Sequence, residues 1–383
     1  MSEAIPNIRH LAAFAATVRH GSVTRAARAV NLTQPALTQA IGGLEASLGA
    51  TLFERSAAGM APSPPALLLA PRVEAALAFI GSPRVTGTQL KAFVAVARAG
   101  SYAGASEATG LSAASLHRAV ADLAVALGQR LIERRGRSIF LTLAGERRLR
   151  GFGLALAELR AGFAEIAEWQ GQSAGRMVIG AMPLSRARWL PEAIALFRGA
   201  HPAVDLVVVE GSHAELAGPL RSGEIDLMLG ALREDSEASD LAQEAVFIDR
   251  PQIVMRSGHP ALASPEGRRR LLEYPWILPG RETPLRRYWE DMVALLGAAV
   301  PHVGIECGSV MTIRQLLLAS DALTLLSPDQ VAVEVAAGLL ALSEPPVEVR
   351  RTIGITSRSG WRPTFTQADF VAMLRGCGTV SVR

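Results

Sequence analysis

The first 145 residues of the chain contain one segment twice. When the sequence is aligned with itself at a shift of 79 residues, residues 11–55 match residues 90–134 without a gap. Of these 45 positions 18 are identical, and they include structurally demanding ones such as Phe14 and Phe93. A repeat of this kind predicts two small domains of one design in tandem.

Each copy predicts three short helices. In the first copy, apolar residues at helical spacing begin at Leu11, and Gly21 is placed to end that helix. Ser22 is placed to cap a second helix, and Thr33 to cap a third. We expect the third helix over residues 34–48, where its first turn accepts a proline without losing a hydrogen bond.

The third helix has one apolar and one polar side. The apolar positions are Leu37, Ile41, Leu44 and Leu48. The polar side shows amides and hydroxyls, which can form hydrogen bonds with base edges in the major groove of DNA. Considered alone, these groups fit a solvated helix face equally well.

Residues 21–27, 32–41 and 48–55 resemble the winged helix-turn-helix domain of LysR-type transcriptional regulators. The last of these segments reads Leu-Gly-Ala-Thr-Leu-Phe-Glu-Arg and leads toward a β-wing. The resemblance implies that Arg55 lies near the wing and the DNA backbone. It also implies that the following residues enter the major groove: Thr33, Gln34, Pro35, Ala36, Thr38 and Gln39.

The two copies depart from the family pattern in opposite ways. In copy one, residues 60–66 replace the usual end of the wing, so we expect a distorted wing. Copy two keeps the wing at residues 139–145, but its recognition helix lacks the Gln-Pro pair. Copy two is therefore a DNA reader of different specificity, a phosphate clamp or a spacer. Its candidate DNA contacts are Ser112, Ser115, His117, Arg118, Arg134, Arg135 and Arg137.

Charge is divided unevenly along the chain. Residues 1–150 contain 17 basic and 8 acidic residues, a net charge of +9. Residues 151–383 contain 22 basic and 27 acidic residues, a net charge of −5, which together account for the +4 of the chain. A basic head on an acidic body is typical of a nucleic-acid binder with a second function.

A helical segment with a continuous apolar seam follows the second copy. Its seam residues recur at spacings of three and four: Leu149, Phe152, Leu156, Leu159, Phe163 and Ile166. The spacing fits a helix that pairs with a partner helix, and LysR-type proteins dimerise through a helix at this place. The alternative is an amphipathic helix that packs on its own domain. The counterpart in copy one, residues 66–80, looks truncated and is interrupted at residues 81–83, which predicts an interdomain linker.

From Gly175 onward, short apolar strands alternate with helices. We expect strands at residues 177–180, 204–209 and 225–229, and helices between them. This βαβ pattern predicts a mainly parallel sheet with ligands at the carboxyl ends of its strands. Several segments resemble the effector domain of the same family, which has a two-lobed fold like that of periplasmic binding proteins.

The expected architecture is therefore a multidomain chain. It has two tandem winged helix-turn-helix domains, which are mainly helical, a linker between them, a linker helix for dimerisation and a two-lobed α/β effector domain. In chain order these span residues 5–66 for copy one, 67–85 for the linker, 86–145 for copy two, 146–170 for the dimerisation helix and 175–383 for the effector domain.

Two segments of the effector domain, residues 279–286 and 355–363, look most like the branch that includes regulators of sugar-binding-protein genes. By family position, the effector cleft would be lined by Met182, Pro183, Leu184, Ser185, Arg281, Thr283 and Ser309. These hydroxyls and one guanidinium suit a sugar or a small carboxylate. Pairing of Arg281 with Glu282 or another surface acid is an equally good interpretation.

Other chemistry has little support in the sequence. Cys307 and Cys377 belong to no metal-spaced cluster, and neither a P-loop nor a nucleophile elbow is present. We therefore expect no metal, no cofactor and no catalytic residue. No apolar stretch approaches the roughly 18 residues of a membrane span, and residues 1–20 do not resemble a secretory signal, so a cytoplasmic protein is expected.

The sequence thus predicts a transcriptional regulator of LysR type that is not an enzyme. Its expected partners are double-stranded DNA, a small polar effector such as a sugar or a small organic or aromatic acid, and further copies of itself in a homodimer or homotetramer. An activator would also contact RNA polymerase. The alternative is a solute-binding or enzymatic α/β protein whose helical head serves protein interaction.

Overall fold

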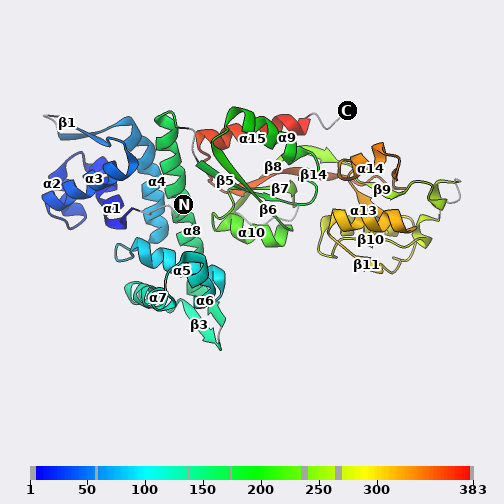
Figure 1. Ribbon diagram of the computed structural model, residues 1–383, viewed down its shortest axis with the longest axis horizontal. Helices are drawn as coiled ribbons and strands as arrows, with labels where there is room; N and C mark the ends of the chain where they lie inside the picture. Colours follow the sequence, from blue (N-terminus) through cyan, green and yellow to red (C-terminus); the bar gives the residue numbers. More distant parts are fainter. Residues whose placement is uncertain are drawn as a thin grey trace.

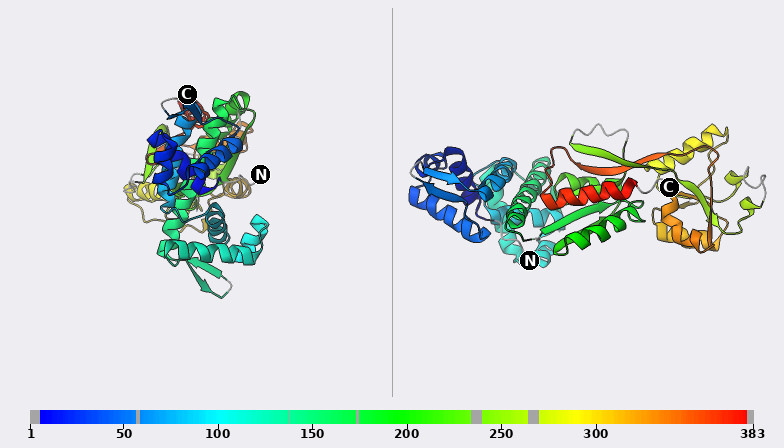
Figure 2. Two further views of the ribbon diagram at one scale, coloured as in Figure 1. Left: turned by 90° about the vertical axis from the view of Figure 1, so that its left-hand side faces the viewer. Right: turned by 90° about the horizontal axis from the view of Figure 1, so that it is seen from above.

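The structure is a computed structural model that describes residues 6–56, 59–136, 138–172, 175–233, 240–263 and 270–379. The molecule is elongated, with two helical units at one end and two α/β lobes that extend to the other (Figures 1 and 2). Arg137 and the side chains of Arg55, Arg134 and Arg135 lie outside the described part. Their expected DNA contacts therefore stay predictions.

The first unit, here called head one, contains three helices and a hairpin: α1 (Ile8–His20), α2 (Val23–Ala29), α3 (Gln34–Leu48), β1 (Phe53–Ser56) and β2 (Gly59–Pro62). Gly21 ends α1 at a φ of 61°, a left-handed conformation that suits glycine. The hydroxyl of Thr33 caps α3 by accepting a hydrogen bond from the backbone N–H of Ala36 at 3.3 Å. The helix boundaries expected from the repeat are confirmed.

Head two repeats this order with α5 (Gly87–Ala99), α6 (Tyr102–Thr109), α7 (Ala113–Leu127), β3 (Ile132–Arg135) and β4 (Ser138–Leu141). In both heads the hairpin is tied to the turn after the first helix at matching positions. The backbone N–H of Met60 donates to the carbonyl of Gly21 at 3.2 Å, and that of Ile139 donates to the carbonyl of Gly100 at 2.9 Å. The two heads are therefore built alike.

The expectation of a distorted wing in head one is wrong. Strands β1 and β2 pair over four residues each, as β3 and β4 do. Ser63, which matches Thr142 of head two in the repeat, holds the end of the hairpin. Its hydroxyl donates to the carbonyl of Thr51 at 2.7 Å and accepts from the N–H of Ala66 at 3.4 Å. Thr142 makes the equivalent pair of contacts in head two, so either hydroxyl closes the wing.

Two long helices, α4 (Pro64–Ile80) and α8 (Leu143–Trp169), follow the heads and pack against each other. Arg148, near the start of α8, donates to the carbonyl of Ile80 at the end of α4, at 3.3 Å. A Cβ atom placed on Gly162, near the end of α8, would lie 2.9 Å from the side chain of Leu69, near the start of α4. The two helices therefore run antiparallel.

Residues 66–80 lie in a helix that is shorter than α8 and ends at Gly81, where the sequence predicts the interruption. The pairing corrects one expectation. The seam of α8 does not require a second chain to cover it, because α4 of the same chain packs against it. Phe152, Leu159 and Ile166 are at most 3% exposed, and they share one apolar core with α4 and both heads.

In the described residues, lobe 1 is a five-stranded sheet in the order β6-β5-β7-β14-β8, with helices on both of its faces (Figure 1). Its strands are β5 (Gly175–Ala181), β6 (Val204–Glu210), β7 (Leu227–Ala231), β8 (Leu241–Asp249) and β14 (Arg351–Arg358). Its helices are α9 (Trp189–Ala200), α10 (His213–Arg221) and α15 (Phe365–Thr379). Strands β5, β6 and β7 run parallel, as the βαβ pattern predicts, so their carboxyl ends meet at one edge.

Lobe 2 has its own core and is joined to lobe 1 by two chain crossings, at residues 250–251 and 344–350. Its strands are β9 (Gln252–Arg256), β10 (Ile277–Leu278), β11 (Ile305–Glu306), β12 (Thr324–Leu326) and β13 (Leu340–Ser343). Its helices are η1 (Pro260–Leu262), η2 (Leu271–Glu273), α12 (Pro284–Leu295), α13 (Val310–Ala319), η3 (Pro328–Val331) and α14 (Ala332–Ala336). Among the described residues, no helix is long and apolar enough to cross a membrane.

Candidate nucleic-acid interface and effector cleft

Helix α3 presents a polar face outward because its apolar side is held in the core of head one. Leu37 and Ile41 are at most 3% exposed, whereas Gln34, Thr38 and Gln39 are exposed. Thr33 and Pro35 are exposed as well, and Ala36 is half-buried. Amides and hydroxyls therefore cluster at the amino-terminal end of α3, where the helix dipole also favours an anion such as phosphate.

An open groove lies between this end of α3, helix α2 and the hairpin. Its lining residues are Val23, Gln34, Pro35, Thr38, Gln39, Gly59 and Met60. The side-chain amide of Gln34 donates to the hydroxyl of Thr24 at 3.0 Å, which holds the Gln34 side chain beside α2. Four of the six residues expected at the major groove, namely Gln34, Pro35, Thr38 and Gln39, thus line one groove next to the wing.

Helix α7 offers different groups at the equivalent place. Ser112 caps the helix by accepting from the N–H of Ser115 at 3.1 Å, and its hydroxyl donates to that of Ser115 at 2.8 Å. The ring of His117 lies 5.2 Å from that of Tyr102, which orients the imidazole. Arg118 is exposed. The four expected contacts on α7 therefore share an exposed face that has a guanidinium where α3 has an amide.

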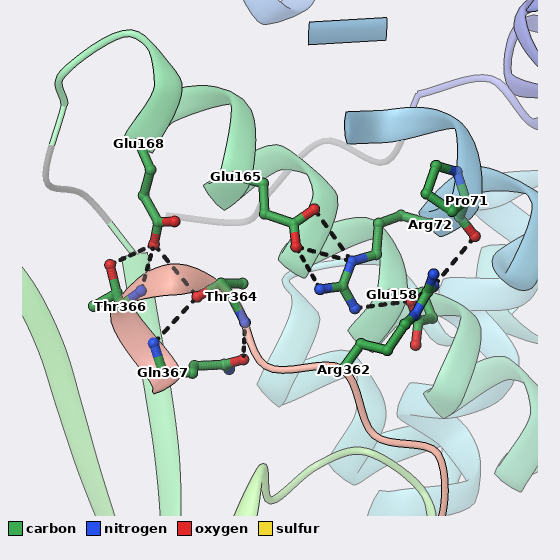
Figure 3. A network of polar contacts seen from close by, with 9 residues as sticks. All are labelled: Pro71, Arg72, Glu158, Glu165, Glu168, Arg362, Thr364, Thr366 and Gln367. Carbon is green, nitrogen blue, oxygen red and sulfur yellow. Dashed lines mark hydrogen bonds and ion pairs between the residues drawn. The ribbon is translucent and has the colours of Figure 1, made fainter. Parts of the chain in front are cut away.

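A buried ionic cluster joins α4 to α8, and sequence reasoning missed it. Arg72 on α4 is 4% exposed and lies between Glu158 and Glu165 of α8 (Figure 3). Burial, the largest influence, lowers the pKa of Arg72, but the hydrogen bonds and charges of the two glutamates outweigh it and leave the pKa raised. An arginine on the apolar face of residues 66–80 was the sequence feature that could have revealed it.

Lobe 1 is fixed to the helix pair by a second group of polar contacts (Figure 3). Arg362 donates to Glu158 at 3.0 Å and to the carbonyl of Pro71 at 3.2 Å, so it touches both helices. The carboxylate of Glu168 accepts hydrogen bonds from the backbone N–H and the hydroxyl of Thr366 at the start of α15. The heads and lobe 1 are therefore mechanically connected through α4 and α8.

The segment after β5 does not line a cleft with its side chains as expected. Met182, Leu184 and Ser185 are at most 8% exposed and belong to the interior of lobe 1. Ser185 uses its hydroxyl to donate to the carbonyl of Met182 at 2.8 Å. Pro183 alone of the four expected residues is partly exposed. The loop does follow the end of a strand, but three of its four side chains are buried in lobe 1.

The expected residues of lobe 2 lie at the amino-terminal ends of two helices. Thr283 caps α12 and donates to the carbonyl of Gly280 at 2.7 Å. Ser309 is exposed and caps α13 by accepting from the N–H of Thr312 at 3.4 Å. Arg281 is exposed, and among the described residues no ion pair joins it to Glu282 or another acid. Helix ends and a guanidinium are groups that suit an anion.

Basic residues that sequence reasoning did not select also lie between the lobes. Arg188, which follows β5, pairs with Asp329 of lobe 2 at 3.1 Å, and this hydrogen bond raises the pKa of Arg188. Arg233 follows β7. Burial lowers the pKa of Arg233, and the positive charge of Arg287 on lobe 2 lowers it further, against the opposite effects of Tyr288 and Glu282. The strand-end rule could have identified both arginines.

His213, at the start of α10, belongs to the same basic region. Burial lowers the pKa of His213, and the nearby positive charges of Arg233 and Arg221 lower it further. The described part of this region therefore favours neutral or anionic groups over further positive charge. Within the described residues, no group of three or more His, Cys, Asp or Glu side chains gathers at a point where it could hold a metal ion.

Comparisons with known proteins agree with this architecture. The model of the LysR substrate binding domain matches residues 170–377, and that of the bacterial regulatory helix-turn-helix protein of the lysR family matches residues 8–67 and 88–146. The transcriptional regulator GalR of Pseudomonas putida is 33% identical over 97% of both chains. PcaQ of Agrobacterium fabrum is 30% identical over 76% of this chain and 94% of its own.

The fold agrees as well. The crystal structure of ArgP from Mycobacterium tuberculosis superposes with a TM-score of 0.58 at 18% identity, over 76% of this chain and 97% of that one. A helix-turn-helix head joined to a two-lobed binding domain defines a ligand-responsive transcriptional regulator and not an enzyme. The chain belongs to the LysR family of such regulators, and residues 170–377 form its effector-binding domain.

Proposed function

We propose that both heads contact double-stranded DNA and that a small organic or aromatic acid, bound between the lobes, controls this binding. The DNA contacts would come from α3 and α7 and, at the wings, from the arginines at positions 55, 134, 135 and 137. The groove between α3 and the hairpin supports this proposal for head one, because it gathers the groups that can hydrogen-bond to base edges.

Recognition by head one has a direct test. Replacing Gln34 with alanine should cost about 1–3 kcal/mol of binding free energy on the cognate operator and relax sequence preference.

The wing of head two has a separate test. Replacing Arg135 and Arg137 together should weaken binding to all sequences and flatten its salt dependence, by about 0.9 in slope for each phosphate that is no longer neutralised. Fluorescence anisotropy at several salt concentrations measures both. An unaltered salt slope would mean that the second wing does not touch DNA.

The effector class is inferred from the charge between the lobes. Burial and the positive charge of Arg287 both lower the pKa of Arg233, and a bound carboxylate would favour its charged form. A neutral sugar would not. We therefore favour an acid over a sugar, with Arg233 as its counter-ion and Arg281, Thr283 and Ser309 as further candidates on lobe 2.

Thermal unfolding in the presence of probe ligands tests this preference. Benzoate and succinate should raise the melting temperature, and glucose should not. A ligand at a hundredfold excess over its Kd stabilises the folded protein by about 2.7 kcal/mol. Arg233→Gln should abolish that shift. Arg250→Gln, in an exposed ion pair with Glu348, is the matched control. A shift with glucose alone, or one that survives in Arg233→Gln, would contradict the proposal.

We also propose that the regulator acts as a homodimer or homotetramer, and that it contacts RNA polymerase if it activates transcription. Because α4 already covers the seam of α8, such an oligomer would assemble through other surfaces. We keep the domain limits expected from the sequence as part of this proposal, with one change. Residues 64–80 form α4 and are assigned to the helix pair.

A further inference from the structure

We propose that a single chain is a complete two-headed DNA-binding unit, which recognises two half-sites of different sequence. This inference rests on the proposed function of the two heads. It goes beyond the proposed function because it specifies how many chains bind one operator and which kind of operator they recognise. Three observations carry it: the antiparallel helix pair, the near symmetry of that pair and the unlike faces of α3 and α7.

The antiparallel pairing places the heads at opposite ends of the helix pair. Head one leads into the start of α4, and head two leads into the start of α8. Because the start of each helix lies beside the end of the other, the heads are set apart along the pair. In Figure 1 they are separate units, with head one to the left of the pair and head two below it. This is the arrangement that two chains produce when each contributes one head and one helix.

The contacts within the pair are themselves nearly symmetric. In a two-fold interface, a contact between positions i and j must recur with the two positions exchanged. Under the 79-residue shift of the repeat, the pair Arg72 and Glu158 becomes the pair Gly151 and Phe79. Both contacts exist: Arg72 meets Glu158 at 3.2 Å, and a Cβ atom on Gly151 would lie 2.9 Å from the carbonyl oxygen of Phe79.

This symmetry defines an approximate two-fold axis near the middle of the pair. The axis falls close to Ala76 of α4 and Ala155 of α8, which are matching positions of the repeat and are both 0% exposed. The helix pair inside one chain therefore has the geometry of a homodimer interface. Since its apolar residues are already buried, a second chain is not required to complete it.

The two recognition helices carry different groups at matching positions. Gln34, Thr38 and Gln39 of α3 correspond to Ala113, His117 and Arg118 of α7. A glutamine amide pairs best with adenine, and an arginine guanidinium pairs best with guanine. The symmetry of an operator mirrors that of the protein that binds it. A pseudo-symmetric protein with unlike helices should therefore bind two unlike half-sites, not an inverted repeat.

Selection of binding sequences from random DNA, with the full-length protein, determines the operator. We expect two dissimilar motifs at a fixed spacing. Native mass spectrometry should then find that each chain of the oligomer takes up one molecule of this operator, which is one chain for each pair of half-sites. One chain for each half-site, or an inverted repeat of a single motif, would overturn the inference.

Substitutions assign each half-site to its head. Gln39→Ala should weaken protection of one half-site and Arg118→Ala that of the other, each by roughly tenfold to a hundredfold. Arg84→Ala, exposed and outside both recognition helices, is the matched control. If Arg118→Ala has no effect while Gln39→Ala weakens both half-sites, head two does not recognise sequence and the inference fails, although head one still binds DNA. If no sequence is selected at all, the proposed function fails with it.

Discussion

At the residue scale, the buried charge of Arg72 contributes to the stability of the contact between α4 and α8. It lies between Glu158 and Glu165, whose side chains are 18% and 17% exposed. Breaking a buried ion pair by removing one partner is costly, because it leaves the other charge uncompensated in a poorly solvated site.

Replacement of Arg72 by methionine should therefore lower the free energy of unfolding by about 3–5 kcal/mol, measured by urea denaturation. Arg19→Met is the matched control, because Arg19 pairs with Glu74 on the surface, where both side chains are well exposed. The control should cost less than about 1 kcal/mol. Equal losses in the two variants would show that the Arg72 cluster does not stabilise the helix pair.

His213 gives the chain a pH dependence with a definite sign. Its pKa is lowered from 6.5 by burial and by Arg233 and Arg221, so the folded protein favours the neutral imidazole. The stability that this contributes is complete above pH 6.5 and is lost as the pH falls below that value. His213→Asn should therefore reduce the fall of the melting temperature between about pH 7 and pH 5. Asparagine at His302, an exposed histidine of lobe 2, is the control, and equal slopes in wild type and His213→Asn would refute this expectation.

At the scale of elements, three glycines of α8 explain how two surfaces approach this helix closely. Glycine inside a helix costs about 1 kcal/mol relative to alanine, so a helix keeps it only where packing compensates. Gly151 and Gly162 face α4, and Gly153 lies against the carbonyl of Ser222 in lobe 1. The three glycines therefore mark where α4 and lobe 1 contact α8.

Gly162→Ala should destabilise the protein although alanine is the better helix former. Its Cβ atom would lie 2.9 Å from Leu69 and 3.0 Å from Arg72, which is too close without a shift of α4. We expect a loss of about 1–3 kcal/mol in thermal or urea unfolding. Gly199→Ala in α9 has open space around it and should instead stabilise by about 0.5–1 kcal/mol. A stabilising Gly162→Ala would mean that the helices are not in close contact there.

Across the whole molecule, lobe 1 is held to the helix pair by contacts at two levels. Arg362 joins Glu158 and Pro71, and Glu168 joins Thr364 and Thr366. Since α4 and α8 also carry the heads, any rearrangement of lobe 1 on ligand binding must either move the helix pair or break these contacts. This is a physical route from the effector domain to DNA.

The double variant Arg362→Ala with Glu168→Ala should loosen this connection. Hydrogen exchange should become faster at residues 364–367, where α15 begins, because the backbone N–H of Thr366 loses its acceptor. The head cores should exchange as before. Arg250→Ala with Glu348→Ala, an exposed ion pair outside the helix pair, is the control. Unchanged exchange at residues 364–367 would show that other contacts hold the junction.

Much of the fold was predictable because local chemistry specifies it. Gly21 requires the end of a helix, Thr33 provides a cap, and the 79-residue repeat transfers each assignment to the second head. The parallel strands of lobe 1 followed from the alternation of apolar runs and helices. The family, the basic head and the candidate recognition residues on α3 were likewise evident from residues alone.

The tertiary structure alone decided which surfaces meet. An apolar seam such as Phe152, Leu159 and Ile166 predicts that one side of a helix is buried. It does not identify the surface that packs against that side. An apolar face binds any complementary apolar face, and nothing in the spacing distinguishes α4 of the same chain from a second copy. The burial of Met182 and Ser185 and the pairing of Arg72 also depend on neighbours that are distant in sequence. Local patterns therefore determined the elements of this protein, while the non-directional nature of apolar contact left their partners to the fold.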